Sequence, residues 1–209
     1  ASSSGKGCGK ALSKLPKQKG ATWAEDDRSD VEEAFNLCLS EYSQIQTHAA
    51  SLEFLKSVFK LMDIPLKESS DKETSRVIAY VSPGPKTVES IIMVHPTDLV
   101  NGQAVAREGK VDYMWGQQKS DVKSIGVMQL MALAFAKKSV KPFKKNLVFV
   151  ATENGQFKDA LQMFPKAEII LNEGGTAFTK QNKEIFLIGS EQKGGAWLKI
   201  KHKNQARLL

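Results

Sequence analysis

The chain of 209 residues is 41% hydrophobic and 25% charged, which fits one globular domain, with or without a mobile tail, and not a disordered protein. Its longest apolar run, residues 125–135, is far shorter than the roughly 18 residues of a membrane-spanning helix, so we expect no membrane span. The net charge of +7 suits a Lys-rich solvated surface or an acidic partner. Arg is scarce and the aromatic residues are not interleaved with basic ones, which argues against a nucleic-acid surface.

Residues 1–28 are predicted to form a flexible basic tail. The first twenty residues carry five Lys and no acidic residue, and they contain too few large apolar side chains to fold alone. Cys8 and Cys38 either form one disulfide or are both free, and the spacing does not decide between the two. The chain begins with Ala and has no apolar signal core. We therefore expect a processed mature form, which favours an extracytoplasmic location, or a trimmed piece of a longer protein.

Residues 29–209 alternate between helical and strand patterns and are predicted to form one domain. A helix is expected to begin at Ser29 or Asp30, with an apolar stripe through Cys38. Further helices are expected over residues 51–62, 124–137 and 157–164. Strands are expected over residues 75–81, 90–94, 144–152, 167–175, 183–194 and 196–203. This alternation predicts an α/β fold with a largely parallel mixed sheet that is flanked by helices on both faces.

Polar residues follow several of the predicted strands, at the edge of the sheet where binding sites gather in such folds. They are His95 and Asp98 after one strand, Glu153 and Asn154 after another, and Glu173 after a third, with Asp121 just before the long helix. Imidazole and carboxylate groups together suit a divalent metal such as zinc, manganese or cobalt. Asp121 could bridge two ions, and an unligated Glu153 could take a proton from a metal-bound water. Such a site would hydrolyse an amide or peptide bond.

The order of these motifs resembles the M20 family of metallopeptidases, which holds carboxypeptidases, aminoacylases and deacylases with a two-metal site. The resemblance runs from about residue 29 to residue 201. Its motifs are PTDLV, WGQQKSDVK, VFVATENG, ILNEGG and SEQKGGAWLKIKHK. The resemblance implies that Asp98 and Glu153 are the catalytic carboxylates. It also implies zinc or a similar divalent ion, held by Asp121, Glu173, His95 and Asn154.

Several departures from the family pattern fall on the chemistry. With Asp98 on the acidic position of the first motif, Pro96 stands where the family has a His ligand. His95 is one residue away, which on a strand points a side chain to the opposite face. Asn154 replaces the second acid of a Glu-Glu pair with a weaker, neutral ligand. The family's lid domain and its C-terminal segment, which carries a further His ligand, have no counterpart before Leu209. Such a site should bind zinc poorly or hold no metal.

We therefore expect a degenerate M20-like domain that is non-catalytic and acts as a structural or interaction module in a complex. Another protein chain, or a C-terminal segment absent from this sequence, would complete its fold. One alternative is a metal-dependent peptidase or amidohydrolase whose missing ligands come from further polypeptide. The other is a basic binding protein that uses its Lys-rich tail against an acidic partner.

Overall fold

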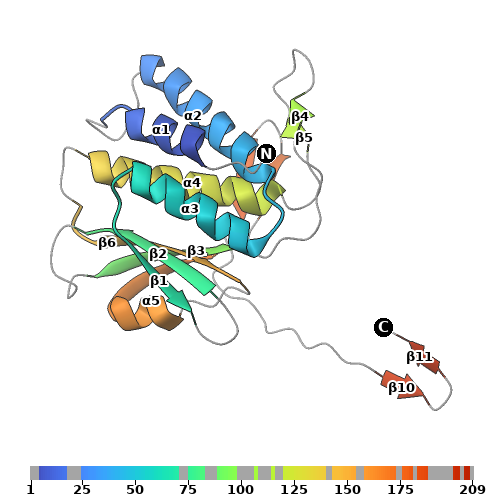
Figure 1. The fold of residues 1–209 in the computed structure, drawn as a ribbon. Coiled ribbons are helices and arrows are strands. Elements are labelled where there is room, and N and C mark those ends of the chain that lie inside the picture. The colour runs from blue at the N-terminus through green and yellow to red at the C-terminus, as the bar shows by residue number, and fades with distance from the viewer. Residues whose placement is uncertain are drawn as a thin grey trace. The chain divides into compact units, whose positions relative to one another are not determined.

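The computed structural model of the chain describes residues 5–17, 25–70, 75–82, 89–97, 106–107, 114–115, 120–139, 143–153, 158–172, 176–180, 183–187, 200–202 and 205–207. The chain divides into two compact units, Ala1–Glu173 and Gly174–Leu209. The first unit contains the helices and a five-stranded sheet, and the second contains two pairs of strands (Figure 1). None of the described helices is long and apolar enough to cross a membrane.

The first unit is built on a sheet with the strand order β1-β2-β6-β3-β7. These strands are β1 (Leu66–Ser70), β2 (Ser75–Val81), β3 (Ser90–Pro96), β6 (Asn146–Thr152) and β7 (Ala167–Leu171). Strand β2 is antiparallel to β1 and to β6, whereas β3 is parallel to β6 and to β7. All strands except β2 therefore run in one direction. The α/β class and the mixed sheet predicted from the sequence are confirmed.

The central strands β3 and β6 are apolar because both of their faces are covered. Every residue of β6 is buried. Successive side chains of a strand point to opposite faces, so Phe149 packs in one hydrophobic cluster while Val148 and Val150 pack in another. In β3, Met93 belongs to the first cluster and Ile92 to the second.

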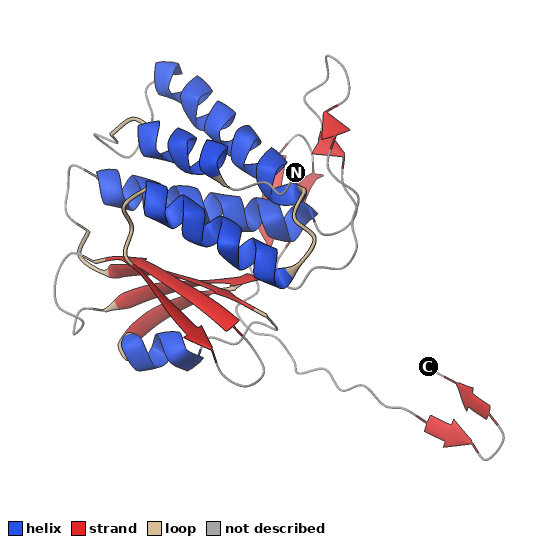
Figure 2. Ribbon diagram, in the orientation of Figure 1, coloured by secondary structure: helices blue, strands red, loops and turns tan. Residues whose placement is uncertain are grey.

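The larger cluster joins one face of the sheet to helices α1 (Lys6–Lys14), α2 (Glu25–Ser43), α3 (His48–Leu61) and α4 (Ser120–Lys138). Helices α3 and α4 contact the sheet, and α1 packs on α2 and α3 (Figures 1 and 2). Helix α3 begins with an N-cap, since the Thr47 side chain accepts a hydrogen bond from the Ala50 amide. Its buried residues, including Leu55 and Phe59, recur at helical spacing and face the core.

The smaller cluster joins the other face of the sheet to α5 (Lys158–Met163) through Ala160 and Phe164. An ion pair fastens this helix to β2, because Arg76 Nη1 lies 2.9 Å from Asp159 Oδ2. The Arg76 side chain is buried, so its positive charge is compensated where water is largely excluded. Ser69 of β1 also donates to Asp159.

The remaining strands form short antiparallel pairs. In the first unit β4 (Ala106–Arg107) pairs with β5 (Met114–Trp115). In the second unit β8 (Thr176–Lys180) pairs with β9 (Lys183–Leu187), and β10 (Ile200–His202) pairs with β11 (Gln205–Arg207).

The N-terminal segment differs most from its prediction. Within residues 1–28, expected to be a flexible tail, the structure contains the whole of α1, and Leu12 of that helix is completely buried. A disulfide between Cys8 and Cys38 joins it to α2. The segment folds because it packs on the domain, which its own composition does not reveal. Helix α2 also begins at Glu25, before the Ser29 or Asp30 cap that the sequence predicts.

Candidate functional site

The carboxyl ends of β3 and β6 lie side by side and form the candidate site. Pro96 is the register partner of Thr152, and the Thr97 amide donates a 2.8 Å hydrogen bond to the Thr152 carbonyl. Glu153, the predicted catalytic base, comes next in the chain and is half-buried. It therefore lies at the same edge of the sheet as the end of the strand that carries His95.

The structure describes the other predicted site residues only in part or not at all. Asp98, Asn154 and Glu173 lie outside the described residues, and for Asp121 the structure describes only the backbone, in the first turn of α4. Their convergence with Glu153 stays a prediction. Among the described residues, no group of three or more His, Cys, Asp and Glu side chains is arranged to hold a metal ion.

His95 lies in the protein core rather than at the sheet edge. Its side chain is 1% exposed, and Nε2 is 2.7 Å from the hydroxyl oxygen of Tyr42 in the last turn of α2. The imidazole also packs against the ring of Phe149 at a centroid distance of 5.8 Å. A Cβ atom added at Gly126 of α4 would lie 2.4–2.8 Å from the imidazole, so only glycine allows this close approach of helix and ring.

The electrostatic surroundings keep His95 neutral. Burial, and secondarily the positive charge of Lys123, lower its pKa to about 3. Burial also raises the pKa of Tyr42 above its ordinary value. Both groups are therefore neutral near pH 7, and neither is tuned to exchange protons there. Nδ1 of His95 has no hydrogen-bond partner among the described residues.

Lys123, the last residue of the WGQQKSDVK motif, caps the end of helix α2. Its Nζ donates to the carbonyl oxygens of Tyr42, Ser43 and Ile45 at 3.0, 3.3 and 2.5 Å. Burial lowers the pKa of Lys123 to about 8, so the ammonium form still predominates at pH 7. The same ammonium lies 5.3 Å from the centroid of the Tyr42 ring. Lys123 thereby fixes the residue that binds His95.

Sequence reasoning missed His48, which ties the start of α3 to this edge. Its Nδ1 lies 2.5 Å from Thr97 Oγ1, and its Nε2 lies 3.0 Å from the Ser75 carbonyl oxygen. Thr97 Oγ1 in turn donates to the Thr152 carbonyl at 3.0 Å. No local pattern in the sequence indicates this contact, because His48 stands 49 positions before Thr97 and follows no strand.

No protein-family model matches the chain, and no curated protein is found to be similar to it. The resemblance to the M20 family therefore rests on the sequence motifs themselves and stays a prediction.

Proposed function

We propose that this chain is a degenerate M20-like domain that does not catalyse a reaction and that serves as an interaction module in a protein complex. The observation that carries the proposal is the apolar surface of β7, which ends the strand order of the sheet. Its large side chains Ile169, Ile170 and Leu171 are 43%, 41% and 48% exposed. Successive residues of a strand face opposite sides of a sheet, so this surface includes both sides.

The opposite edge of the same sheet has a different character. Strand β1 has the sequence LKESS, in which Leu66 is the one large apolar residue, whereas β7 has the sequence AEIIL. Each strand carries one Glu that pairs with a Lys, so the difference lies in the three large apolar residues of β7. Charged side chains on an edge strand oppose pairing with another chain, whereas exposed apolar ones favour it. The contrast supports one occupant for β7: an extended strand of another polypeptide, with apolar side chains on both of its faces, that continues the sheet.

The surroundings of His95 support the non-catalytic part of the proposal. To bind a metal at the sheet edge, the imidazole would have to leave Tyr42 and Phe149 and open a cavity in the core. Cavities of this kind cost a few kcal/mol. Pro96, which stands in the family's ligand position, has no donor atom in its side chain.

Elemental analysis and activity assays test the absence of catalysis. We expect no stoichiometric zinc, manganese or cobalt in the purified protein, and no peptidase or deacylase activity when these ions are added. Tight binding of one or two ions, with activity that Glu153→Gln abolishes, would establish the hydrolase alternative. That alternative is favoured by the half-buried position of Glu153 at the end of β6.

Light scattering at increasing protein concentration tests β7 as an interaction edge. The isolated chain should self-associate through this edge, and Ile170→Lys should reduce the association. The matched control is Met128→Lys, because Met128 is 52% exposed but lies on α4. A chain that stays monomeric at high concentration, or equal effects of both variants, would argue against this role of β7.

A further inference from the structure

Helix α1 has little intrinsic stability. It has nine residues, fewer than an isolated helix needs in water. It contains Gly7 and Gly9 in its interior, and glycine is a poor helix former because the unfolded backbone has so much freedom to lose. Its helical conformation therefore depends on contacts with the rest of the domain.

The two interior glycines allow a close approach to neighbouring helices. A Cβ atom at Gly7 would lie 2.2 Å from Glu41 Oε1 of α2, and one at Gly9 would lie 2.7 Å from Leu61 Cδ1 of α3. The buried side chains of Cys8 and Leu12 complete this contact. The features that weaken α1 as an independent helix are thus the ones that fit it to this surface.

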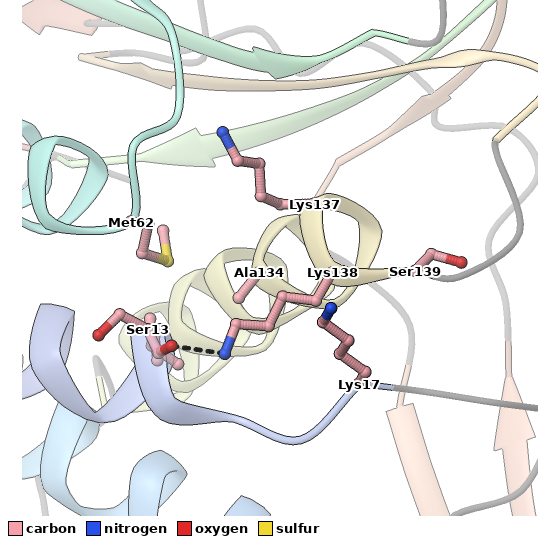
Figure 3. Close-up of a pocket in the computed structure, with 8 residues that line it drawn as sticks. Ser13, Lys17, Met62, Ala134, Lys137, Lys138 and Ser139 are labelled. Atoms are coloured by element: carbon pink, nitrogen blue, oxygen red, sulfur yellow. Dashed lines mark hydrogen bonds between the residues drawn. The ribbon is translucent and has the colours of Figure 1, made fainter.

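Side chains from other helices hold both ends of α1. At its start, the Cys8 amide donates to Glu41 Oε2 at 3.1 Å. At its end, Lys138 Nζ of α4 donates to the carbonyl oxygens of Ser13 and Leu15, each at 2.5 Å, and Figure 3 shows the contact with Ser13. The disulfide of Cys8 with Cys38, also near the start of α1, forms the covalent attachment to α2.

The attachment at the C-terminal end of α1 is the weaker one. A cavity of about 400 Å³ lies there, and Ser13, Lys17 and Lys138 are among the residues that line it (Figure 3). Burial, and secondarily the charge of Lys17, lower the pKa of Lys138. This attachment therefore costs the Lys138 ammonium part of its hydration and brings it near the charge of Lys17, and it lies beside the cavity.

We propose that α1 is a redox-released segment of this domain. Cys8 and Cys38 are fully buried, so a dithiol reductant reaches their disulfide when α1 opens locally. It transfers two electrons and two protons, so the Sγ–Sγ bond breaks, Cys8 and Cys38 each become a thiol, and the reductant becomes a cyclic disulfide. Without the covalent attachment α1 leaves its site, while the sheet and helices α2–α4 stay folded. Its departure uncovers the apolar side chains of Phe54 and Val58, which lie beside Gly5 at the start of α1.

Hydrogen exchange of the full chain, with and without dithiothreitol, tests this proposal. Alkylation of both thiols verifies reduction. Backbone amides of α1 should exchange at least about tenfold faster after reduction, whereas amides of β3 and β6 should keep their rates within about twofold, as expected for local opening. Unchanged protection of α1 after verified reduction would overturn the proposal. An equal acceleration in β3 and β6 would overturn it too, because the disulfide would then stabilise the whole domain.

Variants separate the disulfide from the other attachments. The double variant Cys8→Ser/Cys38→Ser should reproduce the exchange pattern of the reduced protein without any reductant. In the oxidised protein, Lys138→Gln should accelerate exchange at the C-terminal end of α1. Lys10→Gln is the matched control, because Lys10 is an exposed residue of α1 and its replacement removes the same charge. Protection of α1 that persists in the double variant, or equal effects of the two Lys variants, would contradict the proposed attachments.

Discussion

The hydroxyl oxygen of Tyr42 lies 2.7 Å from Nε2 of His95, which joins the last turn of α2 to the end of β3 inside the core. Lys123 holds the end of α2 in place, and Gly126 leaves room for the imidazole. The histidine that the sequence offers as a metal ligand therefore has a structural role in this conformation.

Tyr42→Phe should lower the free energy of unfolding by about 1–2 kcal/mol, because it leaves a buried nitrogen of His95 without its hydrogen bond. Urea denaturation measures the change. Tyr80→Phe is the matched control: its ring packs edge-on against Phe164, and no side-chain hydrogen bond is described for it, so the change should stay within about 0.5 kcal/mol. Equal losses in the two variants would mean that the Tyr42 hydroxyl contributes nothing specific.

Acidification should destabilise the protein through His95. Its pKa falls from an ordinary 6.5 to about 3 on folding, so between these pH values the unfolded chain binds a proton that the folded chain does not. The stability that the buried neutral imidazole contributes is complete above pH 6.5 and is lost as the pH falls toward 3. Over this range the free energy of unfolding changes by at most about 1.4 kcal/mol per pH unit.

Urea denaturation between pH 7 and pH 4 measures this slope in the wild type and in His95→Gln. The variant has no imidazole to titrate, so its stability should depend less steeply on pH, whatever its absolute stability. The carboxylates contribute equally to both proteins, and the comparison removes them. Parallel pH profiles would show that His95 is not buried in the neutral form.

Gly126→Ala should destabilise the fold by about 1–3 kcal/mol, although alanine is the better helix former, because the new methyl group overlaps the imidazole of His95. On the same helix, Met128→Ala should change stability by less than about 0.5 kcal/mol, since Met128 is 52% exposed. Combining Gly126→Ala with His95→Ala should cost less than the sum of the two single changes. A stabilising Gly126→Ala would show that helix and imidazole are not in close contact.

Lys123→Met should lower the free energy of unfolding by about 2–4 kcal/mol, because it removes the ammonium that donates to the buried carbonyl groups of Ser43 and Ile45 and leaves the Tyr42 carbonyl only the bond from the Ile45 amide. Thermal and urea denaturation measure the loss. Lys60→Met provides the control, since Lys60 lies exposed on α3. If the two variants are equally stable, Lys123 does not act as the cap of α2.

Local patterns in the sequence predict most elements of the first unit. The strand predicted over residues 75–81 is β2 with the same bounds, and those predicted over residues 90–94 and 144–152 are β3 and β6 with small shifts. Strand β1 escapes prediction because LKESS has neither an apolar run nor a regular alternation. Its conformation comes from pairing with β2, which local propensity does not encode.

The N-terminal helix escapes prediction for a related reason. Composition indicates that residues near Leu12 cannot fold alone, but it does not indicate that a surface formed by α2 and α3 receives them. The Cys8–Cys38 disulfide was one of two open alternatives, because the number of cysteines does not say whether two of them approach each other.

The sequence by itself determined the α/β class and the positions of Pro96 and Glu153 at two strand ends, because hydrophobic periodicity and strand ends are local properties of the chain. Only the tertiary structure decided that these two ends lie side by side and that His95 is buried and neutral. The second outcome depends on Tyr42, 53 positions away, and on the approach of α4. Packing between distant segments sets the surroundings of a side chain, and those surroundings set its chemistry.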